Sequence, residues 1–269
     1  MRRPVQAVIL AGGRGTRLRP LTDTIPKPMI PFNGRPFLQH LIELLKEQGF
    51  QKVLLLLGYL PQVIQDHFKD GSSFGIQIEY SVSSEDNDTG TRLKLAKDRL
   101  DPSFMLMYCD NYWPLQMDRV WDHFMKTGAH AQITVYNNQD AYTRHNVRVD
   151  QDGMVLRYDK SAPQAELRGT DIGFMLLRKE VVDMLPDENI NFEKLAYPTL
   201  IRATPAGPDA IVWLPCGIVR NDFGRERRGD RWCSRSHEEA RAPWSARPRC
   251  PQAPAACISP REAVQGRLP

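Results

Sequence analysis

An apolar run that passes directly into a glycine-rich segment restricts the fold of this chain more than any other feature. Residues 6–11 read Gln-Ala-Val-Ile-Leu-Ala, and Gly12, Gly13 and Gly15 follow at once. A short apolar run without polar alternation is typical of a strand buried on both faces of a parallel sheet. Open α/β sheets bind ligands beyond the carboxyl ends of such strands. The sequence therefore predicts an α/β fold with a ligand-binding loop after its first strand.

The rest of the first two hundred residues continues this alternation of buried strands and amphipathic helices. Apolar runs and helical spacing predict strands at residues 52–57, 76–82, 104–109, 131–136, 147–150, 155–158, 173–177 and 210–214, and helices at 36–48, 61–68, 93–99, 120–127, near 181 and at 192–201. Residues 147–158 are expected to form a hairpin. Strands that alternate with helices favour a mostly parallel sheet covered on both faces.

The charge of the chain changes at Gly224. Residues 225–269 hold 10 Arg, no Lys and 5 acidic residues, which leaves 36−10=26 basic and 32−5=27 acidic residues before them. Because the body is nearly neutral, it lacks the basic face of a nucleic-acid-binding domain, and no nucleic-acid partner is expected. The Arg-, Pro- and Ala-rich segment has few aliphatic residues, which predicts an irregular, disordered tail. We expect a folded domain at residues 1–224 and this tail at 225–269.

Apolar runs and cysteines limit the cellular setting. The apolar runs, such as residues 53–57, are far shorter than the roughly 20 residues of a membrane helix, so no membrane span is expected. The first glycines arrive before a signal-type apolar stretch could form, which indicates a cytoplasmic protein. The five cysteines form no Cys-x-x-Cys pair and favour neither a zinc site nor disulfides.

The glycine-rich segment and two basic residues after it form a candidate phosphate site. Glycines allow a sharp bend and bring backbone N–H groups against a polyphosphate, and Arg17 adds charged donors. Lys27 lies between Pro26 and Pro28, whose restricted backbones can direct its ammonium toward the loop. The spacing matches neither the P-loop of kinases nor the dinucleotide motif of dehydrogenases. Taken singly, the glycines also suit a turn without a ligand, and Lys27 a solvated surface residue.

Together these residues resemble the signature of the sugar-1-phosphate nucleotidyltransferases. The match consists of residues 12–18, Gly-Gly-Arg-Gly-Thr-Arg-Leu, followed by Pro20-Leu21-Thr22 and Pro26-Lys27-Pro28. The resemblance continues more weakly to about residue 201. It implies a Rossmann-like mixed, mostly parallel sheet with helices on both faces, of the nucleotide-diphospho-sugar transferase type. It also implies a nucleoside triphosphate, a glucose-, mannose- or heptose-type sugar 1-phosphate, and Mg²⁺.

The resemblance assigns a role to each candidate residue. Arg17 would hold the leaving end of the triphosphate, Lys27 would neutralise charge at the phosphorus under attack, and Asp110 would bind the metal. The nucleotide would contact the positions Leu10, Ala11, Gly12, Gly13, Gly15, Thr16 and Gly90, and the sugar phosphate would contact Lys160, Gly173 and Glu193. A lone Asp110 is equally a loop cap, and a lone Lys160 a solvated residue.

The chain also departs from the family pattern. Arg92 and Leu93 follow Gly90-Thr91, where a further glycine is usual, and Ser83 stands near a position that is often glutamine. The base and the sugar therefore stay unassigned, and the sequence does not separate a monomer from a homo-oligomer. Near the end, only Asp222 resembles a second metal ligand. A one-base shift over residues 232–244 yields a sequence like the family's closing turn and helix, so we interpret the tail as a frameshift product, which gene sequencing would test.

Three functions stay open at this point. The first is an active nucleotidyltransferase that makes glycan precursors, and the second is a weakly active or inactive nucleotide- or sugar-sensing domain on the same scaffold. The third is nucleic-acid binding through the basic tail, which predicts strongly salt-dependent binding. Substrate turnover would separate the first two.

Overall fold

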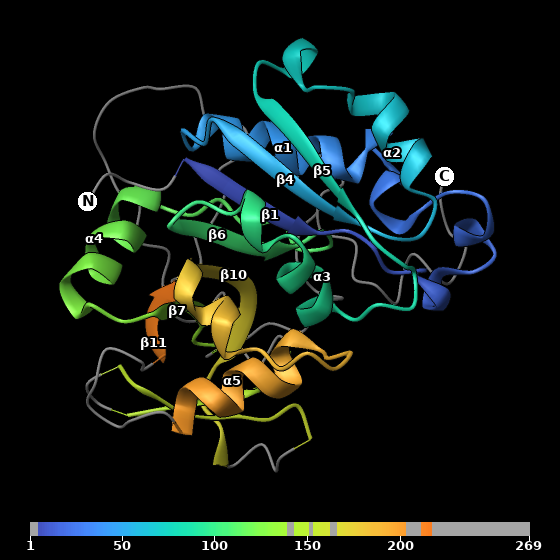
Figure 1. The fold of residues 1–269 in the computed structure, drawn as a ribbon. Coiled ribbons are helices and arrows are strands. Elements are labelled where there is room, and N and C mark those ends of the chain that lie inside the picture. Colours follow the sequence, from blue (N-terminus) through green and yellow to red (C-terminus); the bar gives the residue numbers. More distant parts are fainter. Residues whose placement is uncertain (1–4, 139–142, 151–152, 162–165, 203–210, 217–269) are drawn as a thin grey trace, which may run out of the picture. The chain divides into compact units, whose positions relative to one another are not determined.

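The computed structural model describes residues 5–138, 143–150, 153–161, 166–202 and 211–216, whose path is shown in Figure 1. The chain divides into a unit of residues 1–218 and a unit of residues 219–269. The second unit lies outside the described residues, as do the predicted boundary at Gly224 and the candidate ligand Asp222. None of the described helices combines the length and the apolar character needed to cross a membrane.

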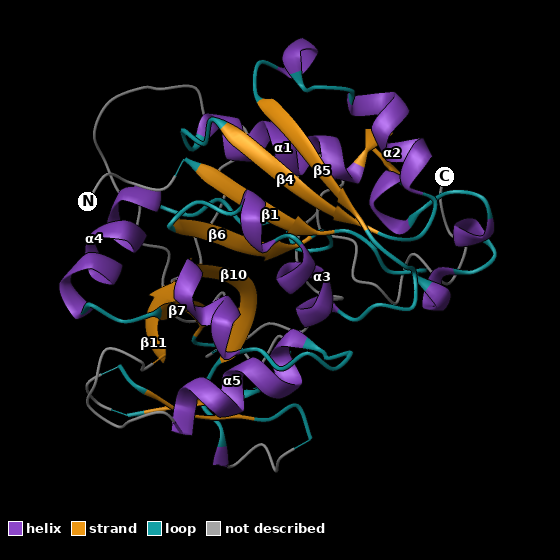
Figure 2. Ribbon diagram, viewed as in Figure 1, coloured by secondary structure: helices purple, strands orange, loops and turns teal. Residues whose placement is uncertain are grey.

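A seven-stranded sheet forms the centre of the described unit, as Figure 2 shows in orange. Its order is β11-β7-β10-β6-β1-β4-β5. The strands are β1 (Gln6–Leu10), β4 (Lys52–Leu57), β5 (Gln77–Val82), β6 (Ser103–Tyr108), β7 (Ala131–Tyr136), β10 (Thr170–Arg178) and β11 (Ile211–Cys216). Among these strands β10 alone is antiparallel to its neighbours β6 and β7. The predicted mixed, mostly parallel α/β sheet is thus confirmed.

Two short antiparallel ribbons accompany the sheet. One pairs β2 (Pro31–Phe32) with β3 (Arg35–Pro36). The other pairs β8 (Val147–Val149) with β9 (Val155–Tyr158) and confirms the predicted hairpin.

Within the described residues, five α-helices lie on the sheet, and each face has its own core. They are α1 (Phe37–Glu47), α2 (Pro61–Phe68), α3 (Thr89–Leu95), α4 (Met117–Thr127) and α5 (Phe192–Arg202). Because side chains alternate along a strand, Ala7 and Ile9 of β1 pack with α1, α2 and α4. Val8 and Leu10 pack with α3, α5 and the 3₁₀ segment η7 (Lys179–Met184). Helices on both faces explain why β1 carries no polar alternation.

Several expected bounds shift; for example, α4 begins at Met117 rather than at residue 120, and the helix expected near residue 181 is the 3₁₀ segment η7. Two further changes are instructive. The helix expected at residues 93–99 begins earlier, at Thr89, because the Asp88 side chain accepts the Thr89 N–H and caps it. It ends at Leu95 and gives way to the 3₁₀ turn η5 (Lys97–Arg99). The strand expected at 173–177 is longer, since β10 begins at Thr170 and passes through an irregularity between Asp171 and Met175.

The strand directions bring distant segments to one edge of the sheet. The carboxyl ends of the parallel strands β1, β4, β5 and β6 lie at the same edge. The antiparallel strand β10 has its amino end there, because Phe174 pairs with Met107 of β6. The segments that follow Leu10, Leu57, Val82 and Tyr108 therefore lie at the same edge of the sheet as the start of β10.

Candidate active site

The glycine-rich loop (residues 11–18) carries unused backbone donors at this edge. Among the described residues, the N–H groups of Gly13, Arg14, Gly15 and Thr16 donate to no carbonyl. Gly15 is half-buried, and the other three residues are exposed. Successive N–H groups on a bent backbone form a concave site for anions. The loop therefore offers backbone donors that suit an anion.

The junction between β1 and the loop is fixed by neighbouring strands. Leu10 and Ala11 are buried, and the N–H of Ala11 donates to the carbonyl of Leu56 at 3.0 Å. The carbonyl of Gly12 accepts the N–H of Tyr59 at 3.1 Å. The junction is therefore held firmly against β4, and the side chains of Leu10 and Ala11 do not reach a ligand.

Gly15 allows the glycine-rich loop to pack closely against the segment that carries Lys27. Its φ is +64°, a left-handed conformation that favours glycine. A Cβ there would lie 2.9 Å from the Cβ of Lys27. The Thr22 hydroxyl donates to the carbonyl of Gly15 at 3.0 Å. The glycine-rich loop and the segment that carries Lys27 are therefore packed directly against each other.

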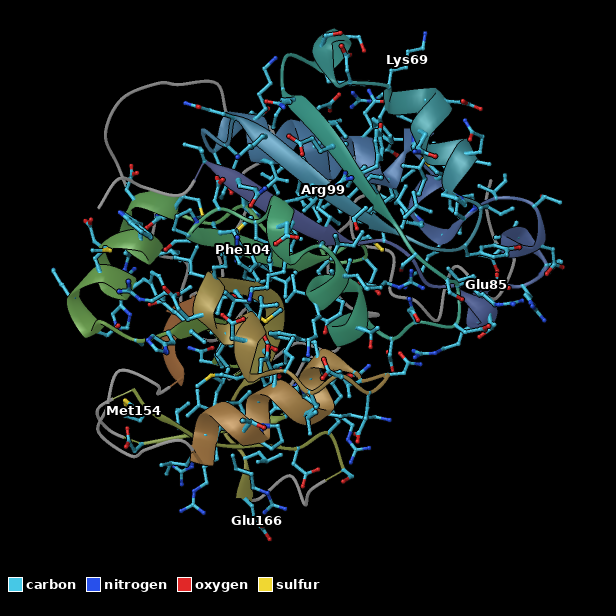
Figure 3. All side chains as sticks on the ribbon, in the orientation of Figure 1. Lys69, Glu85, Arg99, Phe104, Met154 and Glu166 are labelled. Carbon is cyan, nitrogen blue, oxygen red and sulfur yellow. The ribbon has the colours of Figure 1, made fainter. Side chains whose placement is uncertain are left out.

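Two arginines of the loop have different surroundings. Arg17 lies exposed on the 3₁₀ turn η1 (Thr16–Leu18) and makes no ion pair within the described part of the chain. Arg14 pairs with Glu85, which is labelled in Figure 3. Its guanidinium also lies 5.9 Å from the centre of the Tyr59 ring. Arg17 is thus the loop cation available to a ligand, whereas Arg14 ties the loop to the segment after β5.

Lys27 and Asp110 meet beside this loop. Lys27 begins the 3₁₀ turn η3 (Lys27–Met29), which is anchored by the buried residues Pro28 and Met29. Its Nζ lies 2.6 Å from Oδ2 of Asp110, two residues after the end of β6. The side chains are 34% and 43% exposed. An ion pair this exposed contributes only about 0–1 kcal/mol to stability, so a ligand can separate it at small cost.

Gly173, near the start of β10, lies close to the segment that contains Asp110. The side-chain amide of Asn111 donates to the carbonyl of Ile172 at 2.8 Å. Gly173 has φ +77°, and a Cβ there would lie 2.8 Å from Nδ2 of Asn111 and 3.0 Å from the ring of Tyr108. The predicted sugar-phosphate residue Gly173 therefore lies in contact with the segment that carries the predicted metal ligand.

The other two predicted sugar-phosphate residues form an ion pair. Nζ of Lys160 lies 2.5 Å from Oε2 of Glu193. Lys160 is 61% exposed and Glu193 only 16%, so the lysine reaches down from the surface to a nearly buried carboxylate. Lys160 also lies 5.9 Å from the centre of the Tyr158 ring. The structure thus brings together a lysine and a carboxylate that the sequence separates by the whole of β10.

A half-buried carboxyl group that the sequence does not reveal lies beside these residues. Asp171 accepts the Tyr197 hydroxyl at 2.9 Å and the N–H of Gly173 at 2.9 Å. Burial, with a contribution from Glu193, raises the pKa of Asp171 to about 6. The same surroundings raise the pKa of Tyr158 and Tyr108, mainly through burial. The only sequence signal is an acidic residue two positions before Gly173.

Gly90 lies in a helix rather than in a loop. It occupies the first turn of α3, and its N–H donates to the carbonyl of Ile190 at 2.9 Å. A Cβ there would lie 2.8 Å from the Ile190 side chain. Arg92, on the same helix, reaches the glycine-rich loop instead, and its NH2 donates to the carbonyl of Gly12 at 3.2 Å. The departure from the family pattern at this position is the signal that points to Arg92.

The donor set at this edge fits one kind of metal site. No group of three or more His, Cys, Asp or Glu side chains with metal-binding geometry occurs in the described ranges. Asp110 provides an accessible carboxylate next to Lys27 and the glycine-rich loop. Mg²⁺ is commonly held by one or two carboxylates together with phosphate oxygens and water. Asp110 suits a metal that arrives with a polyphosphate, and it does not form a complete protein cage.

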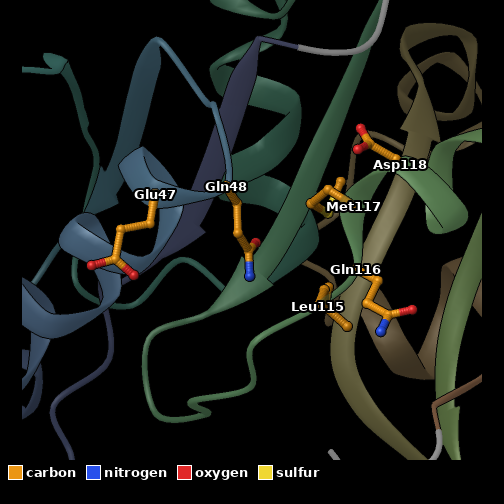
Figure 4. Close-up of a pocket in the computed structure, with 6 residues that line it drawn as sticks. All are labelled: Glu47, Gln48, Leu115, Gln116, Met117 and Asp118. Carbon is orange, nitrogen blue, oxygen red and sulfur yellow. The ribbon is translucent and has the colours of Figure 1, made fainter. Parts of the chain in front are cut away.

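Two other features do not contribute to this chemistry. Burial raises the pKa of the Cys109 thiol to about 12, so this cysteine next to Asp110 is not a thiolate nucleophile at neutral pH. A cavity of about 350 Å³ between the end of α1 and the start of α4, shown in Figure 4, is lined by Glu47, Gln48, Leu115, Gln116, Met117 and Asp118. Its charged lining residues are acidic and do not suit a phosphate.

Sequence comparison finds relatives whose names describe transfer of a nucleotidyl group to a sugar 1-phosphate. The family model for nucleotidyl transferases matches residues 6–167. A heptose 1-phosphate guanylyltransferase of Campylobacter jejuni is 31% identical over 71% of this chain and 84% of its own length. A UTP–glucose-1-phosphate uridylyltransferase of Synechocystis is 33% identical over 68% of this chain and 51% of its own length. A mannose-1-phosphate guanylyltransferase of Mycobacterium tuberculosis is 29% identical over 73% of this chain and 55% of its own length. The chain thus spans about half the length of two of these three relatives.

Solved structures share the fold. HddC from Yersinia pseudotuberculosis has a TM-score of 0.64 and 24% identity, covering 78% of this chain and 90% of its own. The inositol-1-phosphate CTP transferase of T. maritima has a TM-score of 0.67 and 17% identity, covering 81% of this chain and 87% of its own.

Proposed function

Because this chain belongs to the nucleotidyl transferase family, we propose that it transfers a nucleotidyl group from a nucleoside triphosphate to a sugar 1-phosphate. The products are a nucleotide-activated sugar and pyrophosphate. The observation that carries the proposal is the meeting of the donor-rich glycine loop with Lys27 and Asp110 at one edge of the sheet, where Nζ and Oδ2 are 2.6 Å apart. We assign the activity to residues 1–224, the predicted nucleotidyltransferase domain.

The reaction needs positioning and charge rather than a protein nucleophile. A phosphate oxygen of the sugar 1-phosphate attacks the α-phosphorus in line, and pyrophosphate leaves with the electrons of the broken P–O bond. The free N–H groups of the loop and the exposed guanidinium of Arg17 would hold the triphosphate and its leaving end. Lys27 would donate to the phosphate under attack, where negative charge accumulates in the transition state.

The metal in this proposal is Mg²⁺, held by Asp110 and by phosphate oxygens of the substrate. It would supply positive charge that neutralises the phosphates and fixes their geometry. Lys27 pairs with the same carboxylate, so Asp110 would hold the metal in place of its present lysine partner. The ammonium of Lys27 would then be available to the triphosphate.

The sugar phosphate would bind on the other side of Asp110. Lys160 is exposed enough to turn toward a phosphate, and its departure leaves the carboxylate of Glu193 free to accept a sugar hydroxyl. Gly173 would allow close approach of the sugar to the backbone of β10. A hexose or heptose 1-phosphate suits this donor set, and the product would serve as a precursor of cell-surface polysaccharide or another glycan.

The relatives' names cover uridylyl and guanylyl transfer, so we leave the base open. We infer a cytoplasmic reaction because nucleoside triphosphates are kept in that compartment.

A substrate panel tests the proposal. Purified protein is incubated with Mg²⁺, with GTP, CTP, UTP or dTTP, and with glucose, mannose or heptose 1-phosphate, and released pyrophosphate is measured. We expect turnover for at least one pair and none when either substrate is omitted. Triphosphate binding without turnover on any pair would instead support the sensing domain.

A further inference from the structure

Arg92 is a buried arginine that the proposed mechanism does not use. Its side chain is 4% exposed and extends from α3 into the carboxyl edge of the sheet. The guanidinium donates to four oxygen atoms from three segments, namely the Leu57 carbonyl (2.7 Å), the Ser83 hydroxyl (2.9 Å), the Glu85 carbonyl (3.1 Å) and the Gly12 carbonyl (3.2 Å). One side chain thus connects the ends of β1, β4 and β5.

None of these four acceptors carries a charge. Burial lowers the pKa of Arg92, and its nearest electrostatic support comes from Asp88 at the cap of α3. Removing a guanidinium from water without a bonded carboxylate is costly unless hydrogen bonds replace its hydration. Four protein oxygen atoms therefore replace the hydration of this one cation and hold it in place.

Two glycines provide the space that the guanidinium fills. A Cβ on Gly12 would lie 2.5 Å from the central carbon of the Arg92 guanidinium. A Cβ on Gly58 would lie 2.3 Å from NH1 of the same group. Neither glycine has a positive φ. Close approach by Arg92 is therefore the physical reason for a glycine at both positions.

The bond to Gly12 sets the direction of a peptide group in the glycine-rich loop. The Gly12 carbonyl accepts hydrogen bonds both from Arg92 and from the N–H of Tyr59. In a planar trans peptide the carbonyl and the next N–H point in opposite directions. Two donors that hold the Gly12 carbonyl inward therefore turn the N–H of Gly13 outward, where the exposed Gly13 makes no hydrogen bond with a described carbonyl.

We propose that Arg92 is a positioning residue that holds the Gly12–Gly13 peptide with its N–H directed at the phosphates of a nucleoside triphosphate. The inference rests on the proposed function. Arg92 acts through the loop rather than on the base, because both of its terminal nitrogens already donate twice to protein oxygens. Holding the donors in place before binding spares the ligand the cost of ordering them.

Two substitutions disturb this arrangement in different ways. Arg92→Met keeps the length of the side chain but removes every donor. Gly58→Ala leaves Arg92 and the loop unchanged in sequence, yet its methyl group occupies the place of NH1 and displaces the guanidinium. Lys94→Met is the control, since it removes a cation of the same helix that bonds to Leu185 and Asp187 instead.

The measurements are the Kd for each of GTP, CTP, UTP and dTTP with Mg²⁺ by calorimetry, and the KM for the sugar 1-phosphate. For the triphosphate that binds wild-type protein, we expect Arg92→Met and Gly58→Ala to raise Kd about 10- to 100-fold, the size of a lost charged hydrogen bond. The KM for the sugar phosphate should change by less than about twofold, within the usual effect of a remote site. Adding Gly58→Ala to Arg92→Met should have little further effect.

Several outcomes would overturn the inference. Unchanged triphosphate binding in both variants would do so, as would an equal loss for both substrates, which marks a general structural role. If Lys94→Met lowers the affinity for the triphosphate as much as Arg92→Met does, the effect is not specific to Arg92. Because binding is measured without turnover, an inactive wild-type protein that binds a triphosphate leaves the inference testable while the proposed function fails. A wild-type protein that binds none of the four overturns both.

Discussion

Nζ of Lys27 lies 2.6 Å from Oδ2 of Asp110, although 83 residues separate them in the chain. The two reach each other because η3 lies beside the loop after β1, and Asp110 follows the neighbouring strand β6. In the absence of substrate each neutralises the other. The pair therefore keeps a cation and a carboxylate together at the place where phosphates and a metal are proposed to bind.

Lys27→Ala should lower kcat more than it affects folding. Loss of one well-placed charged donor is expected to reduce the rate about 10²- to 10³-fold. The melting temperature should change little, since the ion pair is half exposed. Lys46→Ala is a matched control because Lys46 is exposed on α1 and donates to the carbonyl of Phe74. A purified Lys27→Ala protein with near-normal kcat would contradict the role of Lys27.

Asp110→Asn should weaken binding of a divalent cation in the presence of triphosphate. Substitutions of groups that only orient metal ligands cost about 10- to 100-fold in affinity, so loss of a ligating charge should cost at least as much. Mn²⁺ serves as a paramagnetic substitute, and the free ion is counted by electron paramagnetic resonance. Asp118→Asn, at the cavity of Figure 4, controls for loss of a negative charge. Equal Mn²⁺ affinity of Asp110→Asn and wild-type protein would remove Asp110 from the metal site.

Glu193→Gln should affect one substrate only. The change removes the charge that holds Lys160 and weakens an acceptor for a sugar hydroxyl. We expect the KM for the sugar 1-phosphate to rise about tenfold, the value of one charged hydrogen bond. The KM for the triphosphate should stay constant, as should both values in Glu180→Gln, an exposed position on η7. A parallel rise of both KM values would contradict a sugar-side role.

Asp171 should make the folded protein less stable as the pH rises from about 4 to 6. Its pKa is raised from 3.8 to about 6 by burial, so the unfolded chain releases this proton at a lower pH than the folded protein. The stabilisation is full below the unfolded pKa and is lost as the pH passes the folded value. A shift of this size corresponds to about 3 kcal/mol.

Asp171→Asn tests this dependence. Unfolding free energies of wild-type and variant protein are measured by urea denaturation between pH 4 and pH 7, and their difference removes the contribution of other groups. As the pH rises across this interval, we expect the unfolding free energy of the variant to increase relative to that of the wild type. A constant difference would show that Asp171 titrates alike in both states.

The buried strands were predictable because their signal is local. The residues of β4 and α2 lie where the apolar runs and the flanking glycine and proline indicate. The helix at Thr89 began earlier than expected because its start depends on the Asp88 cap, which the apolar pattern does not mark. The dense, spaced motif of residues 12–28 indicated a candidate phosphate-handling segment for the same local reason.

The sequence by itself thus determined the α/β alternation, the glycine-rich loop and the charged candidates Arg17, Lys27 and Asp110. Only the tertiary structure decided that β10 runs antiparallel and brings Asp171 and Gly173 to the edge where Asp110 lies. It also decided that Lys160 pairs with Glu193 and that Arg92 fills the space over Gly12 and Gly58. These relationships depend on strand order and on packing between segments far apart in the chain, and neither leaves a periodic pattern in the sequence.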